Sequence, residues 1–232
     1  MLFDLDGTLI DSVYQHVLAW QEALGGVGID LSVWKIHRRI GMSGGLFVTA
    51  LLRETGRALS QDQIRALNLA HADAFGRRRD TVRPLPGARE LLAALTEQKV
   101  KRAIATSGLA IAARPALEML ELPADVPLVT RDQVRHAKPD PDLFLAAADR
   151  IGVDIHATIV VGDSIWDLLA ARRAGALSVG LLSGGYGRDE LERAGAYRVY
   201  ADPADLLAHL DEVGVRGAAA DWAAEPDVEA AE

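Results

Sequence analysis

Short apolar runs alternate with helical patterns along most of this chain. The runs are rich in Val, Ile, Leu and Ala, and they predict strands at residues 2–5, 102–106, 128–130, 158–161, 176–181 and 198–200. Apolar residues at helical spacing predict helices at residues 88–97, 111–120, 141–151, 166–174, 188–193 and 203–210. Apolar strands separated by helices are typical of a parallel, doubly wound sheet. The pattern therefore predicts an α/β fold.

A purely helical segment interrupts this alternation directly after the first strand. Ser12 is a candidate N-cap for a first helix whose apolar residues recur from Val13 to Leu24, and further helical patterns cover residues 31–39, 46–54 and 61–78. A linker containing Pro and Gly follows at residues 83–87. We therefore predict a core formed by residues 1–12 and 83–210, a helical insert at residues 13–82 and an acidic, Ala-rich tail at residues 211–232.

Composition narrows the classes of function. The 232 residues are 50% hydrophobic and 25% charged, as in ordinary globular proteins, and the net charge of −8 argues against binding nucleic acid through a basic surface. The absence of cysteine excludes disulfides, thiolate metal ligands and cysteine nucleophiles. No apolar run approaches the roughly 18 residues of a membrane span, and the first residues lack the basic region of a secretory signal. We expect a cytoplasmic protein without nucleic-acid or membrane partners, and the sequence leaves its oligomeric state open.

The charge is distributed unevenly. Residues 13–82 carry nine basic and six acidic side chains, whereas residues 211–232 carry one basic and seven acidic side chains. The predicted insert is therefore the basic part of an acidic protein, and an anionic ligand would be attracted by local groups rather than by the total charge.

Two aspartates end the first predicted strand. Asp4 and Asp6 are alternate residues, so their side chains start out on the same side of the strand at its carboxyl end. Aspartate is depleted in strands, and neighbouring carboxylates repel each other unless a cation or a shared proton compensates. A polar turn would explain one aspartate but not two. Because ligands bind at the carboxyl edge of such sheets, the pair indicates a site for a hard cation.

Two later segments offer groups that could hold an anion. In Thr106-Ser107-Gly108, a hydroxyl and a turn rich in backbone amides follow a predicted strand, which suits a phosphate oxygen, although an ordinary helix N-cap uses the same residue types. Lys138 lies between prolines at the start of a helix, in a chain with 21 Arg and 4 Lys. A compact point charge at a rigid position favours a functional role for Lys138 over that of a surface lysine.

Two more aspartates follow the apolar run at residues 158–161. Asp163 comes directly after that strand, and Asp167 lies one helical turn later on the same side. Ser164-x-x-Asp167 is also a capping box, so both a capping role and a functional role stay open for Asp167. Capping does not explain Asp163, which we therefore take as a functional residue.

In their order and spacing, these segments resemble the haloacid dehalogenase-like hydrolase superfamily. The similarity rests on the opening Asp4-Leu5-Asp6-Gly7-Thr8 and the closing Gly162-Asp163-Ser164-x-x-Asp167, and it covers the chain to about residue 210. The resemblance implies a Rossmann-like core with an α-helical cap inserted after the first strand. It places the chain in the phosphatase branch that includes phosphoglycolate phosphatases and β-phosphoglucomutases.

The resemblance implies a role for each acidic residue. Asp4 would attack phosphorus and form an aspartyl-phosphate, and Asp6 would act first as general acid and then as general base. Mg2+ would be held by the Asp4 carboxylate, the Asp6 backbone carbonyl and Asp163. Dehalogenases and phosphonate-cleaving members resemble this chain but lack an acid at the position of Asp6. The presence of Asp6 therefore favours a phosphate ester as substrate.

The same resemblance assigns the groups around the phosphate. Thr106 and Lys138 would hold the phosphoryl oxygens, and Asp167 would orient Lys138 or a metal-bound water. We include Ser107 and Gly108, which follow Thr106 in the same turn, as candidate substrate-binding residues.

Three further candidate substrate-binding residues lie in the predicted cap. His16 and Trp20 are one helical turn apart and face the same way. Family members that act on sugar phosphates often carry a similar His-x-x-x-Trp with the histidine close to the catalytic acid, although packing alone would also place two such residues together. Ser43 belongs to a glycine-rich loop at the position where such caps place a specificity loop.

Three functions are compatible with these residues. The first is Mg2+-dependent hydrolysis of a small-molecule phosphate ester, such as a sugar phosphate or phosphoglycolate. The second is a phosphosugar isomerase of the β-phosphoglucomutase type, which is disfavoured because Ile40 and Gly44 stand where that group carries basic residues. The third is a receiver-like signalling domain, which would place its phospho-acceptor on a later strand and has no helical insert. We favour the hydrolase.

Overall fold

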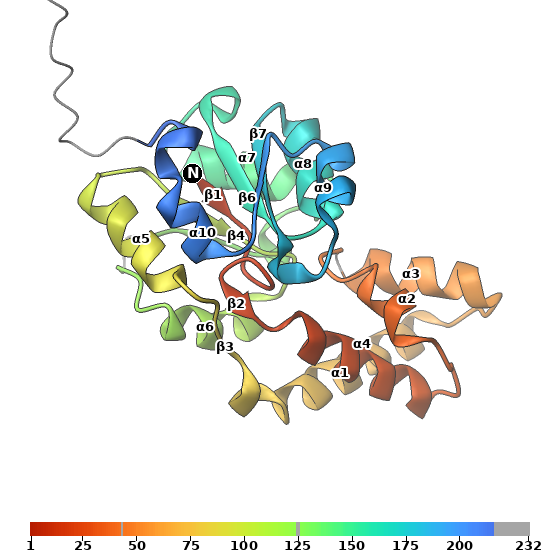
Figure 1. The fold of residues 1–232 in the computed structure, drawn as a ribbon. Helices are drawn as coiled ribbons and strands as arrows, with labels where there is room; N and C mark the ends of the chain where they lie inside the picture. The colour runs from red at the N-terminus through yellow and green to blue at the C-terminus, as the bar shows by residue number, and fades with distance from the viewer. Residues whose placement is uncertain (43, 124–125, 216–232) are drawn as a thin grey trace, which may run out of the picture.

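The computed structural model describes residues 1–42, 44–123 and 126–215 (Figure 1). Six strands form one parallel sheet in the order β5-β4-β1-β6-β7-β8. Their bounds are β1 Leu2–Phe3, β4 Ala103–Ala105, β5 Leu128–Val129, β6 Ile159–Gly162, β7 Leu177–Leu181 and β8 Arg198–Tyr200. Each strand overlaps a run that was predicted to be a strand, and the α/β class is confirmed.

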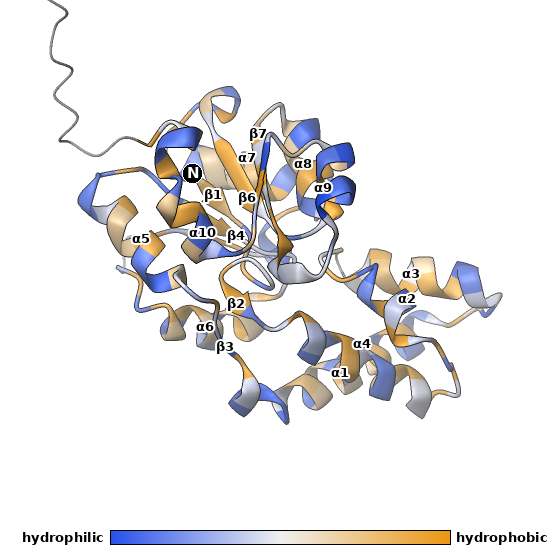
Figure 2. Ribbon diagram, viewed as in Figure 1, coloured by the Kyte–Doolittle hydropathy of each residue, from blue (hydrophilic) through white to orange (hydrophobic). Residues whose placement is uncertain are grey.

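Helices cover both faces of this sheet. They are α5 (Ala88–Glu97), α6 (Ala110–Met119), α7 (Asp142–Arg150), α8 (Ile165–Ala174), α9 (Arg188–Ala194) and α10 (Pro203–Ala208). Alternate strand residues point to opposite faces, so Phe3 packs in the cluster that holds residues of α5 and α10, while Leu2 packs with residues of α7 and α8. Burial on both faces explains why the central strands β1, β4 and β6 are continuously apolar. In Figure 2 the strands are mostly hydrophobic, and the helices that surround the sheet carry hydrophilic residues on their outer sides.

A short antiparallel strand pair joins the two ends of the helical insert. β2 (Ile10–Asp11) pairs with β3 (Arg83–Pro84), so the chain leaves the core and returns to it at one place. The sequence did not predict this pair, because two residues are too few to show an alternating pattern. The segment at residues 83–87 was predicted to be a linker, and this is corrected for its first two residues.

In its described residues, the insert contains four helices that share a hydrophobic cluster. They are α1 (Val13–Gly26), α2 (Val33–His37), α3 (Gly44–Thr55) and α4 (Gln61–Gly76), and a 3-10 turn at Arg79–Thr81 follows. All members of the cluster, among them Trp20, Phe47 and Leu67, come from the insert itself. In Figure 1 these helices form a lobe beside the sheet. The insert therefore has its own packing, as a helical cap requires.

The core extends past its predicted end at residue 210. A 3-10 turn covers Leu210–Val213, and the side chain of Val213 is buried in the same cluster as Phe3. Asp211 and Glu212 are exposed, as the predicted solvated tail requires, whereas Val213 is buried, and residues 216–232 of that tail lie outside the described residues. Within the described part of the chain, no helix combines the length and the apolar composition that a membrane span needs.

Gly87 offers a test of the packing between α5 and α10. Its φ is +73°, and a Cβ on it would lie 2.4 Å from the Cα of Ala204. Gly56 has a similar φ of +66°, but a Cβ on it would meet no atom within 4 Å. We expect Gly56→Ala to lower the free energy of unfolding by about 1 kcal/mol through backbone strain alone. Gly87→Ala should cost about 3 kcal/mol, because backbone overlap adds to that strain. Equal losses in urea unfolding would contradict this packing.

Candidate active site

The carboxyl ends of three neighbouring strands bring the candidate residues together. β1 lies between β4 and β6, and Asp4, Thr106 and Asp163 each follow the end of one of these strands. The backbone N–H of Asp4 donates to the carbonyl of Val161 at 2.9 Å, which continues the pairing of β1 with β6 beyond the strand. Residues that are far apart in the sequence therefore meet at the centre of one sheet edge.

Lys138 lies at the centre of this group with its side chain completely buried. Its Nζ forms ion pairs with Oδ1 of Asp4 and, at 2.8 Å, with Oδ1 of Asp167, and it lies 5.1 Å from the centroid of the Phe144 ring. Burial acts to lower the pKa of Lys138, but the charges of Asp167 and Asp4 outweigh it and raise the pKa above its ordinary value. Lys138 is therefore a fixed cation.

Three buried carboxylates surround this cation. Asp4, Asp163 and Asp167 each offer an oxygen within 4.8 Å of the others. Burial raises the pKa of Asp4 to about 7, although the charge of Lys138 opposes this. Burial, followed by the charge of Asp167, raises the pKa of Asp163 well above its ordinary value. Three carboxylates and one ammonium carry two uncompensated negative charges, which a divalent cation would balance.

The hydrogen bonds show how much of the bonding capacity of Asp4 and Asp163 is already used. Oδ1 of Asp163 accepts from the Thr8 hydroxyl at 2.8 Å, and Oδ1 of Asp4 accepts from Lys138. The second oxygen of each carboxylate accepts no hydrogen bond from a residue that the structure describes. Carboxylate oxygens are the ligands that hard divalent cations prefer. Asp4 and Asp163 therefore fit a metal site.

Asp167 makes contacts that are compatible with both roles that the sequence left open. Its Oδ2 accepts from the backbone N–H of Ser164 at 3.1 Å and from the Ser164 hydroxyl at 2.6 Å, at the start of α8. Its Oδ1 pairs with Lys138. A Cβ on Gly162 would lie 2.3 Å from the Cβ of Asp167, so the close approach requires glycine there. Asp167 thus caps a helix with one oxygen and orients Lys138 with the other.

Asp6 has a different set of partners. Its Oδ1 accepts from the Ser12 hydroxyl at 2.6 Å and lies 3.5 Å from Nε2 of His16. Burial acts to raise the pKa of Asp6, but His16 and Ser12 outweigh it and hold the pKa below its ordinary value. Ser12 occupies the predicted N-cap position, yet its hydroxyl bonds to Asp6 and not to the helix, so its expected capping role is corrected.

Trp20, which the sequence placed beside His16 as a substrate-binding candidate, is 6% exposed. Its ring stacks on that of His71, with 4.1 Å between the ring centroids, and packs against that of Phe47, with 4.3 Å between the centroids. Nε2 of His71 lies 3.2 Å from Nδ1 of His16, and burial lowers the pKa of His71 to about 2. Trp20 is therefore a core residue of the insert, separated from Asp6 by two imidazoles. The sequence left packing open as the alternative to substrate binding for Trp20, and its contacts are those of a packed residue.

The turn after β4 contacts the insert. Oγ1 of Thr106 accepts from the backbone N–H of Gly108 at 3.0 Å, and the Ser107 hydroxyl donates to the carbonyl of Gly41 at 2.9 Å. Ser107 therefore joins the core to the loop after α2. Ser43, which follows in the same loop, lies outside the described residues.

The end of α2 makes a second contact with the core. The carbonyl of Arg38 accepts from Nε1 of Trp166 at 3.2 Å and from the Tyr186 hydroxyl at 2.9 Å. The Arg38 guanidinium pairs with Glu190 and lies 4.3 Å from the centroid of the Tyr186 ring. Together with the contact between Ser107 and Gly41, these bonds hold the insert over the carboxyl edge of the sheet.

The sequence did not predict the contacts of several residues of the site. Thr8 belongs to the opening motif, but its bond to Asp163 links positions 155 residues apart. His71 lies in α4 and Arg38 directly follows α2, and neither belongs to a motif, so only the folded structure shows which residues they contact. A hydroxyl directly after the two aspartates was the one signal that could have pointed to Thr8.

Comparison with known proteins identifies the family. A family model described as haloacid dehalogenase-like hydrolase matches residues 1–175. The chain belongs to this family. The haloacid dehalogenase-like fold agrees with the Rossmann-like sheet described above, and family membership sets aside the receiver-like alternative.

Individual relatives cover most of this haloacid dehalogenase-like hydrolase. A probable phosphatase, IndB, of Dickeya dadantii is 34% identical over 206 residues, which cover 84% of this chain and 85% of that protein. A phosphoglycolate phosphatase of Agrobacterium fabrum is 31% identical over 190 residues and covers 79% and 80%. The crystal structure of a hydrolase from Pseudomonas syringae is 55% identical, with a TM-score of 0.89, and covers 91% of this chain and 97% of that chain.

Removal of the buried ammonium tests the electrostatic arrangement without an activity assay. In chelator-treated protein at neutral pH, Lys138→Met should lower the free energy of unfolding by about 3–5 kcal/mol, because it leaves buried carboxylates without a counter-charge. Lys101→Met is the matched control, since the Lys101 side chain is exposed and, among the residues that the structure describes, bonds only to the carbonyl of Gly152, at 3.3 Å. Urea unfolding measures both variants, and similar small losses would contradict the arrangement.

Proposed function

We propose that this hydrolase cleaves a small-molecule phosphate ester in a Mg2+-dependent reaction that passes through an aspartyl-phosphate on Asp4. The observation that carries the proposal is the buried group of Asp4, Asp163 and Lys138 at the centre of the sheet edge, with Asp6 nearby in a separate hydrogen-bond environment. Two relatives named as phosphatases support the same reaction class.

Asp4 is the proposed nucleophile because one of its oxygens is uncommitted while Lys138 holds the other. Attack by this oxygen forms a bond to phosphorus as the bond to the ester oxygen breaks. Bound Mg2+, held by Asp4, Asp163 and the carbonyl of Asp6, would supply the positive charge that keeps the carboxylates ionised and stabilises the phosphoryl oxygens. Lys138, oriented by Asp167, and Thr106 bind the remaining phosphoryl oxygens in this proposal.

Asp6 is the proposed acid and base. Without a substrate, Ser12 and His16 favour its ionised form. A phosphate anion beside it disfavours a second negative charge, so substrate binding raises the pKa of Asp6 and loads it with the proton that the leaving oxygen needs. The carboxylate left behind then takes a proton from the water that attacks phosphorus. This second step releases inorganic phosphate and restores Asp4.

The contacts between insert and core complete the proposed site. Ser107 is bonded to Gly41, so we infer that its hydroxyl holds the insert closed over the substrate. Gly108 and His16 line a cavity next to Asp6 and are the proposed contacts of the leaving group. Closure over the phosphate would remove bulk water from the site and so strengthen the electrostatic interactions there.

Phosphate release from a panel of esters tests this function. The panel contains p-nitrophenyl phosphate, phosphoglycolate, ethyl phosphate and hexose phosphates, each with Mg2+ and with a chelator. We expect hydrolysis only with Mg2+ and a loss of at least about 1000-fold in Asp4→Asn, which lacks the nucleophile. Asp62→Asn is the control, because the Asp62 side chain is 91% exposed. Full activity in Asp4→Asn, or no hydrolysis of any ester, would contradict the proposal.

The isomerase alternative has a distinct product. An enzyme of the β-phosphoglucomutase type would convert β-glucose 1-phosphate to glucose 6-phosphate without releasing phosphate. We expect release of inorganic phosphate, and formation of glucose 6-phosphate would replace the hydrolase with the isomerase.

A further inference from the structure

Four aromatic rings from two helices of the insert interlock beside the proposed catalytic acid. His16 and Trp20 lie one turn apart on α1. His71 and Phe75 lie one turn apart on α4. The His16 ring stacks on that of Phe75, with 3.9 Å between the ring centroids. The His71 ring stacks on that of Trp20, with 4.1 Å between the centroids, so each histidine has one face against an aromatic ring of the other helix.

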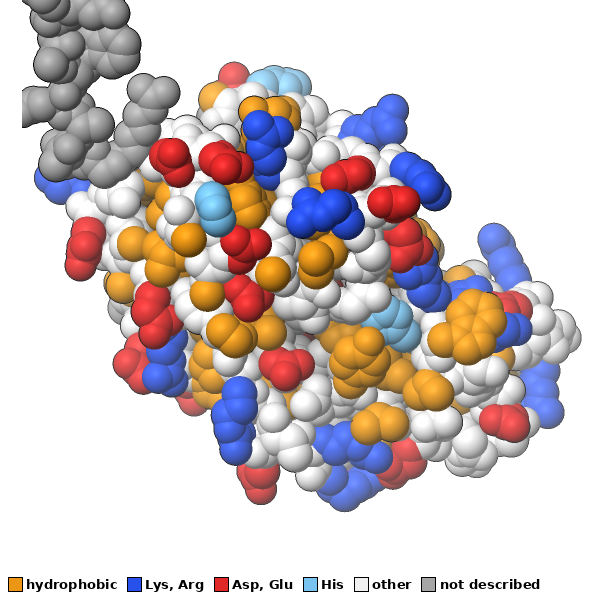
Figure 3. Space-filling view, viewed as in Figure 1, with side chains coloured by type: hydrophobic (Ala, Val, Ile, Leu, Met, Phe, Trp, Pro, Cys, Tyr) orange, Lys and Arg blue, Asp and Glu red, His pale blue; other side chains and the backbone are white. Residues whose placement is uncertain are grey.

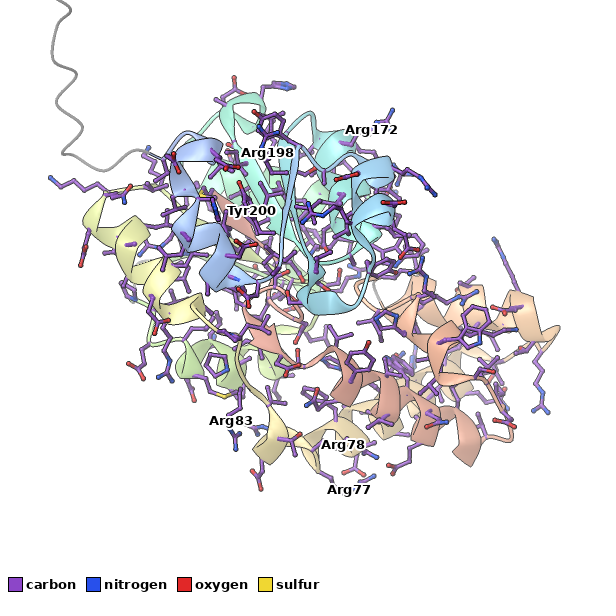
Figure 4. The ribbon with its side chains drawn as sticks, viewed as in Figure 1. Arg77, Arg78, Arg83, Arg172, Arg198 and Tyr200 are labelled. Atoms are coloured by element: carbon purple, nitrogen blue, oxygen red, sulfur yellow. The ribbon has the colours of Figure 1, made fainter. Side chains whose placement is uncertain are left out.

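Surface ion pairs also join α1 and α4. Arg77 and Arg78 directly follow α4, and both pair with Glu22 of α1. Figure 3 shows basic side chains gathered at the lower edge of the molecule, where Figure 4 labels these two arginines. The positions of His16 and His71 are therefore set by contacts at more than one place along the pair of helices.

Stacking alone does not decide which edge of the His16 ring faces Asp6. A half turn about the Cβ–Cγ bond keeps the ring in the same plane but exchanges each nitrogen with a carbon. Nδ1 of His16 lies 3.2 Å from Nε2 of His71, and this hydrogen bond would be lost in the flipped ring. With the bond formed, Nε2 of His16 lies 3.5 Å from Oδ1 of Asp6. His71 therefore selects the edge of His16 that faces the acid.

The positions of the imidazole protons follow from the neighbours of each ring. A carboxylate only accepts hydrogen bonds, so Nε2 of His16 must carry a proton to bond with ionised Asp6. In neutral His16, Nδ1 is then an acceptor that needs a donor. Burial lowers the pKa of His71 to about 2, so this ring is neutral and can donate its single proton from Nε2. The donors then run from His71 to His16 and from His16 to Asp6.

The two carboxylate oxygens of Asp6 differ in their partners. The Ser12 hydroxyl donates to Oδ1 at 2.6 Å, and Nε2 of His16 lies against the same oxygen. Oδ2 accepts no hydrogen bond from a residue that the structure describes. Oδ1 therefore orients the carboxyl group, and Oδ2 is the oxygen that can exchange a proton with a substrate.

We propose that His71 is a positioning residue for the proposed acid and base. Its Nε2–H donates to Nδ1 of His16, which holds the Nε2–H of His16 toward Oδ1 of Asp6. Oδ2 of Asp6 then gives its proton to the leaving oxygen and later takes one from the attacking water. This inference rests on the proposed phosphatase function, and it goes beyond that function in assigning the proton transfer to Oδ2 and the orientation of Asp6 to a residue of α4.

Two esters with different leaving groups test this role. An alkoxide needs a proton in order to leave, whereas p-nitrophenol leaves without an acid. The kcat/KM is measured for p-nitrophenyl phosphate and for the alkyl phosphate of the panel that the wild type hydrolyses fastest. His71→Phe keeps an aromatic ring but lacks the donor. We expect it to lower kcat/KM by roughly 10- to 100-fold for the alkyl phosphate and by less than about threefold for p-nitrophenyl phosphate.

Two further variants separate positioning from folding. The ratio of the two kcat/KM values does not depend on the fraction of the protein that is folded, so a partly unfolded variant still gives it. His71→Gln places an amide N–H near the lost Nε2–H and should restore part of the wild-type ratio. Leu67→Val is the matched control, because Leu67 lies in the same helix with only 1% of its surface exposed and its truncation weakens packing without touching His16. It should leave the ratio unchanged.

The outcomes separate this inference from the proposed function. Equal losses on the two esters in His71→Phe, no loss on the alkyl phosphate, no restoration by His71→Gln, or the same change of ratio in Leu67→Val would overturn the role of His71 and leave a phosphatase. A wild type that hydrolyses p-nitrophenyl phosphate but no alkyl phosphate would contradict the acid role of Asp6, and this inference with it. Failure to hydrolyse p-nitrophenyl phosphate as well would contradict the phosphatase itself.

Discussion

The ion pairs of the buried Lys138 ammonium with Asp4 and Asp167 are the interactions on which the site depends. Burying carboxylates is costly unless their charge is compensated. The lysine compensates one of three, which allows the strands β1 and β6 to end in aspartates at the centre of the sheet. The two remaining charges are what makes the site suitable for a divalent cation and, with that cation, for a phosphate group.

Two aspartates that are two residues apart have opposite environments. Burial raises the pKa of Asp4 to about 7, whereas Ser12 and His16, working against burial, hold the pKa of Asp6 below its ordinary value. Carboxyl groups whose environments separate their pKa values can take different chemical roles. The core supplies the environment of Asp4, and the first helix of the insert supplies much of that of Asp6. The insert therefore contributes to the environment of the proposed catalytic acid.

Much of the fold could be predicted because its signals are local. Short runs rich in apolar residues indicated the six strands, and Asp4 and Asp163, each at the end of such a run, indicated the edge of the sheet where the site lies. The β2–β3 pair could not be predicted, since two-residue strands carry no periodicity. Trp20 shows a different limit of the sequence. Its spacing from His16 suits both a residue that binds substrate and a residue that packs in the insert core, and only its neighbours in the structure distinguish the two. Partners such as Thr8 for Asp163 and His71 for His16 depend on tertiary contacts.

The central claim is that Asp4 carries the phosphoryl group during turnover, and trapping that group tests it most directly. Asp6→Asn retains the nucleophile but lacks the base that activates water, and p-nitrophenyl phosphate has a leaving group that needs no acid. The variant is mixed with this ester and Mg2+, quenched in acid and digested for peptide mass spectrometry. The account predicts a burst of p-nitrophenol and a phosphoryl group on Asp4. A burst without phosphorylated Asp4, or with the phosphoryl group on another residue, would contradict it.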